Sequence, residues 1–127
     1  MDSPRILLVD DSETQRELWR TTIRAAWPQA RLQEAEDARE ALGRMRLEAF
    51  DLILADHHMA GMTGIELLEV VYREHPDVLR VMVTGVEEFE VAREAINRAH
   101  VHAFLPKGAG VDVLRERLGM LLKAKKS

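Results

Sequence analysis

The chain has 127 residues, of which 46% are hydrophobic and 31% are charged, and its formal net charge is −4. This length favours one domain covering residues 1–127, and the absence of cysteine excludes disulfides and thiolate metal sites. The sequence shows no apolar run of membrane-spanning length and no signal-peptide layout at its start. Because the net charge also argues against a nucleic-acid surface, we expect a cytoplasmic protein without direct contact to membranes or nucleic acid.

Five short apolar stretches have the length of β-strands. The third is apolar on both faces, which is typical of a strand covered on both sides in a parallel sheet. The second alternates polar and apolar residues, as a strand at the edge of a sheet does. The five expected strands are residues 5–9, 31–35, 52–55, 80–83 and 103–105.

Helical patterns separate these strands. Three of them begin with a capping-box sequence, in which a Ser, Thr or Asp is followed three residues later by Gln or Glu. These pairs are Ser12 and Gln15, Asp37 and Glu40, and Thr63 and Glu66. A fourth helix is expected from about Glu87 to Ala99 and a fifth from about Val111. Strands alternating with helices predict a doubly wound parallel sheet with right-handed crossovers.

Helical spacing also predicts which faces point inward. For the first helix we expect an inward stripe with Leu18, Thr22 and Ile23, and packing roles for Trp19 and Trp27. The fourth helix offers a small, weakly apolar face, which makes it the least firmly docked. That face comprises Ala92, Ala95, Ile96 and Ala99.

Polar residues follow four of the strands, at the point where each strand ends. Asp10 and Asp11 follow the first strand, Asp56 the third, Thr84 the fourth and Lys107 the fifth. In open α/β sheets the ligand crevice lies at the carboxyl ends of the strands. Three carboxylates gathered there repel one another unless a cation lies among them. Hard divalent ions, Mg²⁺ above all, are bound through such carboxylates.

This arrangement resembles the receiver domain of bacterial two-component response regulators over nearly the whole chain. The motifs that carry the resemblance are the acidic pair after Ile6-Leu7-Leu8-Val9, Asp56 with Met59 and Gly64 downstream, Thr84-Gly85, and Phe104-Leu105-Pro106-Lys107. The resemblance implies a flavodoxin-like fold, with a five-stranded parallel sheet in the order 2-1-3-4-5 and five helices, similar to the chemotaxis receivers.

The resemblance further implies that Asp56 is the phosphoacceptor of a phosphorelay. A histidine kinase or a phosphotransfer protein would supply the phosphoryl group. Mg²⁺, or Mn²⁺ in its place, would be held by Asp11, Asp56 and the backbone carbonyl of His58, with Asp10 acting mainly through water. Such a protein is not a conventional enzyme, although it catalyses its own phosphorylation and dephosphorylation at Asp56. An Asp carboxylate suits this role because it is ionised at pH 7 and needs no general base.

A conformational switch is also implied. Lys107 would pair with the phosphoryl oxygens, and Thr84 would move toward the phosphate while Phe104 rotates inward to fill the space left. The surface of the fourth helix, fifth strand and fifth helix would then change for an output domain, a partner protein or a second copy in a homodimer. His58 and Val86 flank the path of the hydrolytic water in this reading. We expect a long-lived phosphorylated state, because Val86 offers that water no hydrogen bond and the bulk of His58 could obstruct it, although a neutral imidazole at His58 could instead help hydrolysis.

Two loops depart from the family pattern. Ala60 replaces the usual proline after Met59, and Gly108 replaces the proline after Lys107. Without that proline a cis bond before Gly108 costs about 2.5–4 kcal/mol, so we expect a trans bond, with positive φ at Gly108 or Gly110. Because Gly108 replaces the usual proline, an alternative stays open: the chain could be a degenerate receiver that serves as a phosphorylation-independent docking or dimerisation module. A working receiver and a degenerate one could each stand alone or belong to a larger protein.

Other readings fit less well. Adjacent histidines at His57 and His58, beside a carboxylate, could suggest a transition-metal site. Successive side chains in an extended loop diverge, however, which favours two unrelated polar residues. A flavin-binding relative needs a phosphate loop after the first strand, where two acids would repel phosphate. A phosphatase with an aspartyl phosphate would want a second acid where His58 stands.

Overall fold

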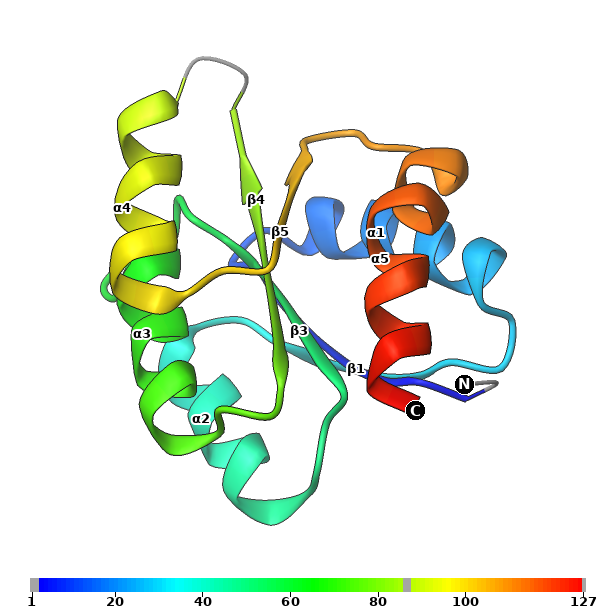
Figure 1. The fold of residues 1–127 in the computed structure, drawn as a ribbon, viewed down its shortest axis with the longest axis horizontal. Helices are drawn as coiled ribbons and strands as arrows, with labels where there is room; N and C mark the ends of the chain where they lie inside the picture. Colours follow the sequence, from blue (N-terminus) through cyan, green and yellow to red (C-terminus); the bar gives the residue numbers. More distant parts are fainter. Residues whose placement is uncertain (1–2, 86–87, 127) are drawn as a thin grey trace.

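Strands and helices alternate along the whole chain in the computed structural model, which describes residues 3–85 and 88–126 (Figure 1). The elements are β1 (Arg5–Val9), α1 (Glu13–Ala26), β2 (Arg31–Ala35), α2 (Ala38–Leu47), β3 (Leu52–Asp56), α3 (Gly64–Glu74), β4 (Leu79–Thr84), α4 (Phe89–Ala99), β5 (Ala103–Pro106) and α5 (Val111–Lys126). The strands form one parallel sheet in the order β2-β1-β3-β4-β5, which confirms the expected fold. Within the described residues, no helix is long and apolar enough to cross a membrane.

The register of the sheet brings the ends of the strands to one edge. Val9 pairs with Ala55, so the residues that follow β1 and the last residue of β3 are neighbours. On the other side of β3, Asp56 pairs with Val83. Thr84 at the end of β4 in turn pairs with Pro106 at the end of β5. The polar residues at the ends of four strands therefore lie together at the carboxyl edge of the sheet.

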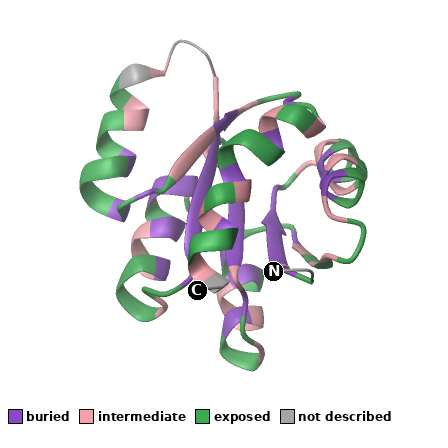
Figure 2. Cartoon of the chain, turned by 45° about the vertical axis from the view of Figure 1, so that its right-hand side comes forward, coloured by how far each residue is buried: buried purple, intermediate pink, exposed green. Residues whose placement is uncertain are grey.

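Two apolar cores cover the two faces of the sheet. In Figure 1, α2, α3 and α4 lie on one side and α1 and α5 on the other. Because successive side chains of a strand point to opposite faces, Leu7 and Val9 contribute to the first core, and Ile6 and Leu8 to the second. Figure 2 shows the result, with buried strands in the centre and exposed residues on the outer faces of the helices.

The helix starts follow the capping patterns. Thr63 and Glu66 form a complete capping box, with each side chain accepting the other's backbone N–H. At Ser12 and Asp37 the side chain accepts the N–H three residues later, which is the main bond of the motif. The expected start of the fourth helix near Glu87 falls outside the described residues, and α4 as described begins at Phe89.

The prediction that Leu18 and Ile96 point inward is wrong. Leu18 is 55% exposed, because α1 turns the neighbouring stripe with Trp19 to the core. Ile96 is 51% exposed, whereas Ala95 and Ala99 are fully buried. Adjacent helical residues point about 100° apart, so a one-residue error in the choice of stripe moves a side chain from core to solvent. The packing role expected for Trp19 is confirmed, since it is buried in the second core.

Arg80 lies in β4 and is only 3% exposed, although it has no carboxylate partner among the described residues. Its guanidinium stands 5.1 Å from the ring centre of Tyr72 and donates hydrogen bonds to four backbone carbonyls. These belong to Pro76, Val78, Ala99 and His100, at 2.8–3.3 Å. One buried cation thereby ties the ends of α3 and α4 to the sheet.

Candidate phosphoacceptor site

Three acids lie at the carboxyl edge of β1 and β3. Asp10 is 2% exposed and Asp56 4% exposed, while Asp11 is exposed to solvent. Asp10 follows the pair Val9–Ala55, so it lies just past the end of β1 and beside Asp56 at the end of β3, and adjacent strands are spaced by about 4.8 Å. The sheet therefore holds two buried carboxylates side by side, with a third on the outside of the pair.

Each carboxylate accepts a backbone N–H. Ser12 donates to Asp10 Oδ1 at 2.9 Å, His58 donates to Asp56 Oδ1 at 3.3 Å, and Ala60 donates to Asp11 Oδ2 at 3.0 Å. The described residues offer no donor to Asp56 Oδ2, which leaves this oxygen available to a ligand or an electrophile.

Burial shapes the charge of the site. Burial raises the pKa of Asp10. The N–H of Ser12 opposes this shift, because its hydrogen bond stabilises the ionised carboxylate. The negative charges of Asp56 and Asp11 raise this pKa further, and Lys107 lowers it. The charges of Asp56, Asp11 and Lys107 are thus close enough to act on Asp10, as expected for residues gathered at one edge.

The donor set fits a magnesium ion. Mg²⁺ prefers oxygen ligands and commonly takes one or two carboxylates while it keeps several waters. Among the described residues the oxygens of the three acids do not all come within 4.8 Å of one another, so they offer an open site and not a closed cage. The carbonyl of His57 accepts from Met59 and Gly64, whereas no described residue donates to the carbonyl of His58. That carbonyl remains available as a further oxygen ligand.

Gly64 allows α3 to begin directly against the loop that follows Asp56. A Cβ at this position would stand 2.6 Å from the carbonyl oxygen of Asp56 and 2.7 Å from the Cα of His57. Both are backbone atoms that cannot rotate away. The glycine in the Asp56 motif is therefore required by a close approach of two backbones.

Thr84 and Phe104 lie on neighbouring strands beside this edge. Thr84 is half-buried, and Phe104 packs against the core formed by α2, α3 and α4. A cavity of about 200 Å³ is lined by both residues and by Arg117, whose guanidinium donates to the carbonyl of Phe104 at 2.7 Å. Space for a side-chain rearrangement thus exists between them. Val86, the other expected tuning residue, lies outside the described residues.

Lys107 lies on an exposed loop. Its charge lowers the pKa of Asp10, but in the described part of the chain no ion pair joins it to an acid. The bond before Gly108 is trans, as are all other peptide bonds among residues 3–85 and 88–126, and Gly108 has φ 79°. The prediction for this loop is confirmed, with the glycine providing a turn that proline could not adopt.

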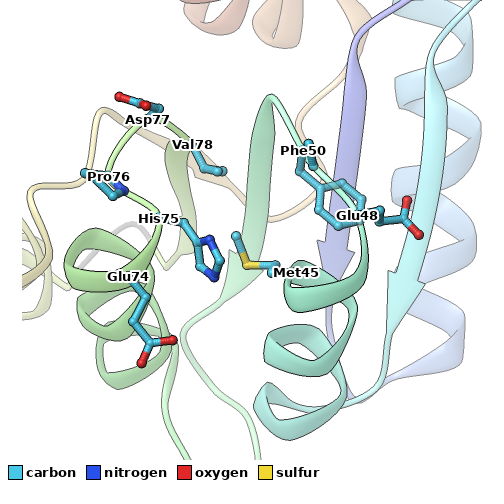
Figure 3. Close-up of a pocket in the computed structure, with 9 residues that line it drawn as sticks. Met45, Glu48, Phe50, Glu74, His75, Pro76, Asp77 and Val78 are labelled. Carbon is cyan, nitrogen blue, oxygen red and sulfur yellow. The ribbon is translucent and has the colours of Figure 1, made fainter.

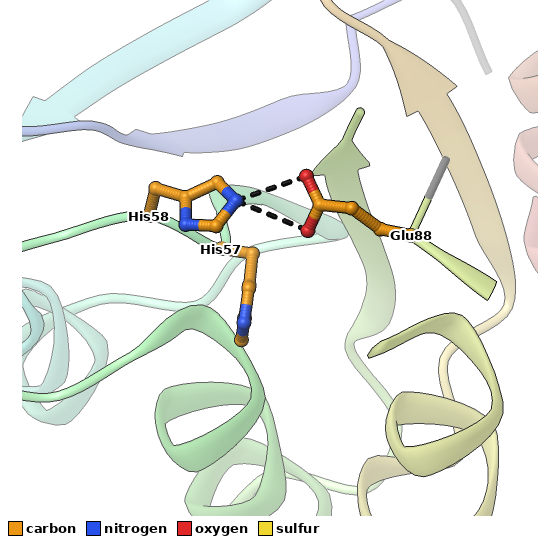
Figure 4. Close-up of side chains that lie close together, drawn as sticks. All are labelled: His57, His58 and Glu88. Carbon is orange, nitrogen blue, oxygen red and sulfur yellow. Dashed lines mark hydrogen bonds and ion pairs between the residues drawn. The ribbon is translucent and has the colours of Figure 1, made fainter. Parts of the chain in front are cut away.

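His57 and His58 lie closer together than two diverging side chains would, and their being functionally unrelated stays a prediction. Their ring centres are 5.0 Å apart, but in Figure 4 only His58 reaches Glu88, just before α4, while the ring of His57 points another way. His58 Nε2 lies 2.9 and 3.0 Å from the two carboxylate oxygens of Glu88. This contact lowers the pKa of Glu88, while burial lowers the pKa of His57. Sequence reasoning missed Glu88 because only the folded chain brings the β4–α4 loop beside the β3–α3 loop.

A larger cavity, of about 300 Å³, opens at the opposite edge of the sheet (Figure 3). Met45, Phe50, His75 and Val78 contribute to its wall, and Phe50 and Val78 precede β3 and β4. It therefore lies at the amino ends of the strands, away from the acids, and takes no part in the site described above.

Comparisons with known proteins agree on one family. The family model for the response regulator receiver domain matches residues 6–119. The chemotaxis protein CheY of Pseudomonas aeruginosa is 33% identical over 118 residues, which cover 90% of this chain and 92% of that protein. The response regulator protein PilR of the same species is 30% identical over 124 residues, which cover 97% of this chain and 27% of PilR.

A solved structure extends the likeness to three dimensions. The signal receiver domain of an HD domain-containing protein from Pseudomonas fluorescens superimposes with a TM-score of 0.89 at 25% identity, covering 99% of this chain and 91% of that one. The chain spans less than a third of the length of several curated relatives that it matches.

Proposed function

Because this chain belongs to the response regulator receiver family, we propose that it accepts a phosphoryl group on Asp56 from a histidine kinase or a phosphotransfer protein. The observation that carries the proposal is the buried pair Asp10 and Asp56, with Asp56 Oδ2 free of a donor in the described part of the chain. We also propose that residues 1–127 form one receiver domain and that the protein is located in the cytoplasm.

In the proposed reaction Asp56 Oδ2 attacks the phosphorus of a phosphohistidine. A phosphorus–oxygen bond forms, the phosphorus–nitrogen bond breaks, and the leaving imidazole retains the electron pair and takes up a proton. The product is an aspartyl phosphate. Such transfers require mainly positioning and neutralisation of the phosphoryl charge, and the carboxylate nucleophile requires no separate base.

In this proposal a divalent cation and Lys107 neutralise the negative charge of the phosphoryl group. Asp11, Asp56 and the carbonyl of His58 would hold Mg²⁺ or Mn²⁺ directly, and Asp10 would act through water. The bound ion would supply charge stabilisation at the phosphoryl oxygens. Lys107 would contribute a point charge from its exposed loop.

Phosphorylation would then bias a two-state switch. Thr84 would hydrogen-bond a phosphoryl oxygen, and Phe104 would move into the cavity of about 200 Å³ between them. Because Arg117 of α5 holds the carbonyl of Phe104, a shift at β5 would be transmitted to α5. The surface of α4, β5 and α5 would thereby report the phosphorylation state to an output domain or a partner, including a second copy of the chain.

Intact-mass measurement after incubation with acetyl phosphate tests this function. We expect a gain of one phosphoryl group with Mg²⁺, no gain with EDTA, and no gain in Asp56→Asn. Lack of phosphorylation in the folded wild type would overturn the proposal. It would favour the docking module instead, for which the specific observation is that Lys107 forms no ion pair with the acids among the described residues.

A further inference from the structure

A second group of ligand-type side chains lies beside the acids. His57 and His58 come from the loop after β3, and Glu88 comes from the loop before α4; we call these three residues the His–His–Glu cluster. One potential ligand atom from each residue lies within 4.8 Å of those of the other two. In the described part of the chain this is the only group of three histidine or acidic side chains that meets this condition.

The hydrogen bonding of the cluster is incomplete. His58 Nε2 is shared between both carboxylate oxygens of Glu88, and one of these oxygens also accepts the N–H of Gly85 at 3.0 Å. By contrast, the Nδ1 atom of His57 is buried and has no hydrogen-bond partner among residues 3–85 and 88–126. Buried polar atoms are almost always satisfied in folded proteins, so an unpaired one calls for a water molecule or an ion.

The ligand types select the class of ion. Two imidazoles and one carboxylate suit Zn²⁺ and its transition-metal neighbours, whereas Mg²⁺ prefers oxygen ligands alone. Tetrahedral ligands at about 2.0–2.2 Å from zinc lie about 3.3–3.6 Å apart, so separations within 4.8 Å must shorten by at most about 1.5 Å. His58 is exposed and can supply this movement by side-chain rotation.

We propose that His57, His58 and Glu88 form a binding site for one divalent transition-metal ion of the zinc class, which bridges the β3–α3 and β4–α4 loops. Three protein ligands leave a fourth tetrahedral position for water or another ligand. The site is separate from the oxygen site of the three acids, and it does not depend on the phosphorylation proposed above.

Titration calorimetry of the full chain with ZnCl₂, in EDTA-free buffer containing excess Mg²⁺, tests this site. We expect one Zn²⁺ per chain in the wild type and at least tenfold weaker binding in Glu88→Gln and in His58→Gln. Glu88→Gln keeps an oxygen that can accept the Gly85 N–H, so it removes the charge with little change in shape. His75→Gln, at the opposite edge of the sheet, is the matched control and should bind as the wild type does.

Two further experiments locate the bound zinc ion. Asp11→Asn alters the acid site and should leave Zn²⁺ affinity unchanged; a comparable loss in this variant would place the ion among the acids and overturn the proposal. Imidazole NMR signals of His57 and His58 should shift with one equivalent of Zn²⁺, while those of His75 stay in place. Absence of binding to the wild type, or equal weakening in His75→Gln, would also overturn it and leave water as the partner of His57.

Discussion

Replacing Asp10 with Asn should stabilise the metal-free protein. The amide has the size of the carboxylate and can still accept the Ser12 N–H, so the variant removes a buried charge without opening a cavity. Two like charges about 5 Å apart, the spacing of adjacent strands, repel by about 3 kcal/mol at an effective dielectric constant of 20. Lys107 offsets part of this repulsion. We therefore expect a gain of about 1–3 kcal/mol in the free energy of unfolding at pH 7.

The pH dependence of this gain follows from the raised pKa of Asp10. A folded-state pKa above the ordinary value means that the folded protein binds the proton more tightly than the unfolded chain does. The ionised group therefore lowers stability above its folded pKa, and the wild type recovers stability as the pH falls through that value. The difference between wild type and Asp10→Asn should narrow from pH 7 toward pH 4.

Urea melts of both proteins in EDTA, repeated across this pH range, measure the effect. Asp77→Asn, an exposed acid at the opposite edge of the sheet, is the control and should change stability by less than about 0.5 kcal/mol. Saturation with Mg²⁺ should stabilise the wild type, by about 1.4 kcal/mol at ten times its dissociation constant, and the variant less. A variant that is no more stable than the wild type in EDTA at pH 7 would refute the reasoning.

Three other substitutions test separate parts of the structure. Arg80→Met should lower the free energy of unfolding by about 2–6 kcal/mol, because two buried carbonyls lose their donor at about 1–3 kcal/mol each. Arg98→Ala, which breaks only surface ion pairs, should cost at most about 1 kcal/mol in the same melts, and equal losses would contradict this account of Arg80. Gly108→Ala should destabilise by about 1–2 kcal/mol because its φ is 79°, whereas Gly110→Ala, without positive φ, should not; matching melting curves would contradict the assignment of the turn. Val86→Asn should speed loss of the phosphoryl group by offering a hydrogen bond to the hydrolytic water, which phosphate release would measure, and an unchanged or slower rate would count against this role.

The sequence predicted the strand ends well because that prediction needs only local information. An apolar run followed by a polar residue marks the end of a buried strand, and parallel strands place such ends at one edge. Asp10, Asp56 and Thr84 were located in this way. The turn at Gly108 was also predictable, since it depends on the chemistry of a single peptide bond.

What sequence reasoning missed depends on tertiary placement. Leu18 and Trp19 are adjacent apolar residues of α1, and which of the two faces the core is decided by the packing of the whole helix against the sheet. Glu88 contacts His58, which lies 30 residues earlier in the chain, and only the folded structure brings the two together. Arg80 appeared as the start of a strand, while its burial depends on carbonyls from the ends of two helices.

The most direct measurement of the central claim is the position of the phosphoryl group. Borohydride reduces an aspartyl phosphate to homoserine, so reduction after treatment with acetyl phosphate and Mg²⁺ marks the phosphorylated residue permanently. Peptide mass mapping should then find homoserine at position 56 and unmodified aspartate at positions 10 and 11. Homoserine at position 10 or 11, or unmodified aspartate at all three, would contradict the assignment of Asp56 as the phosphoacceptor.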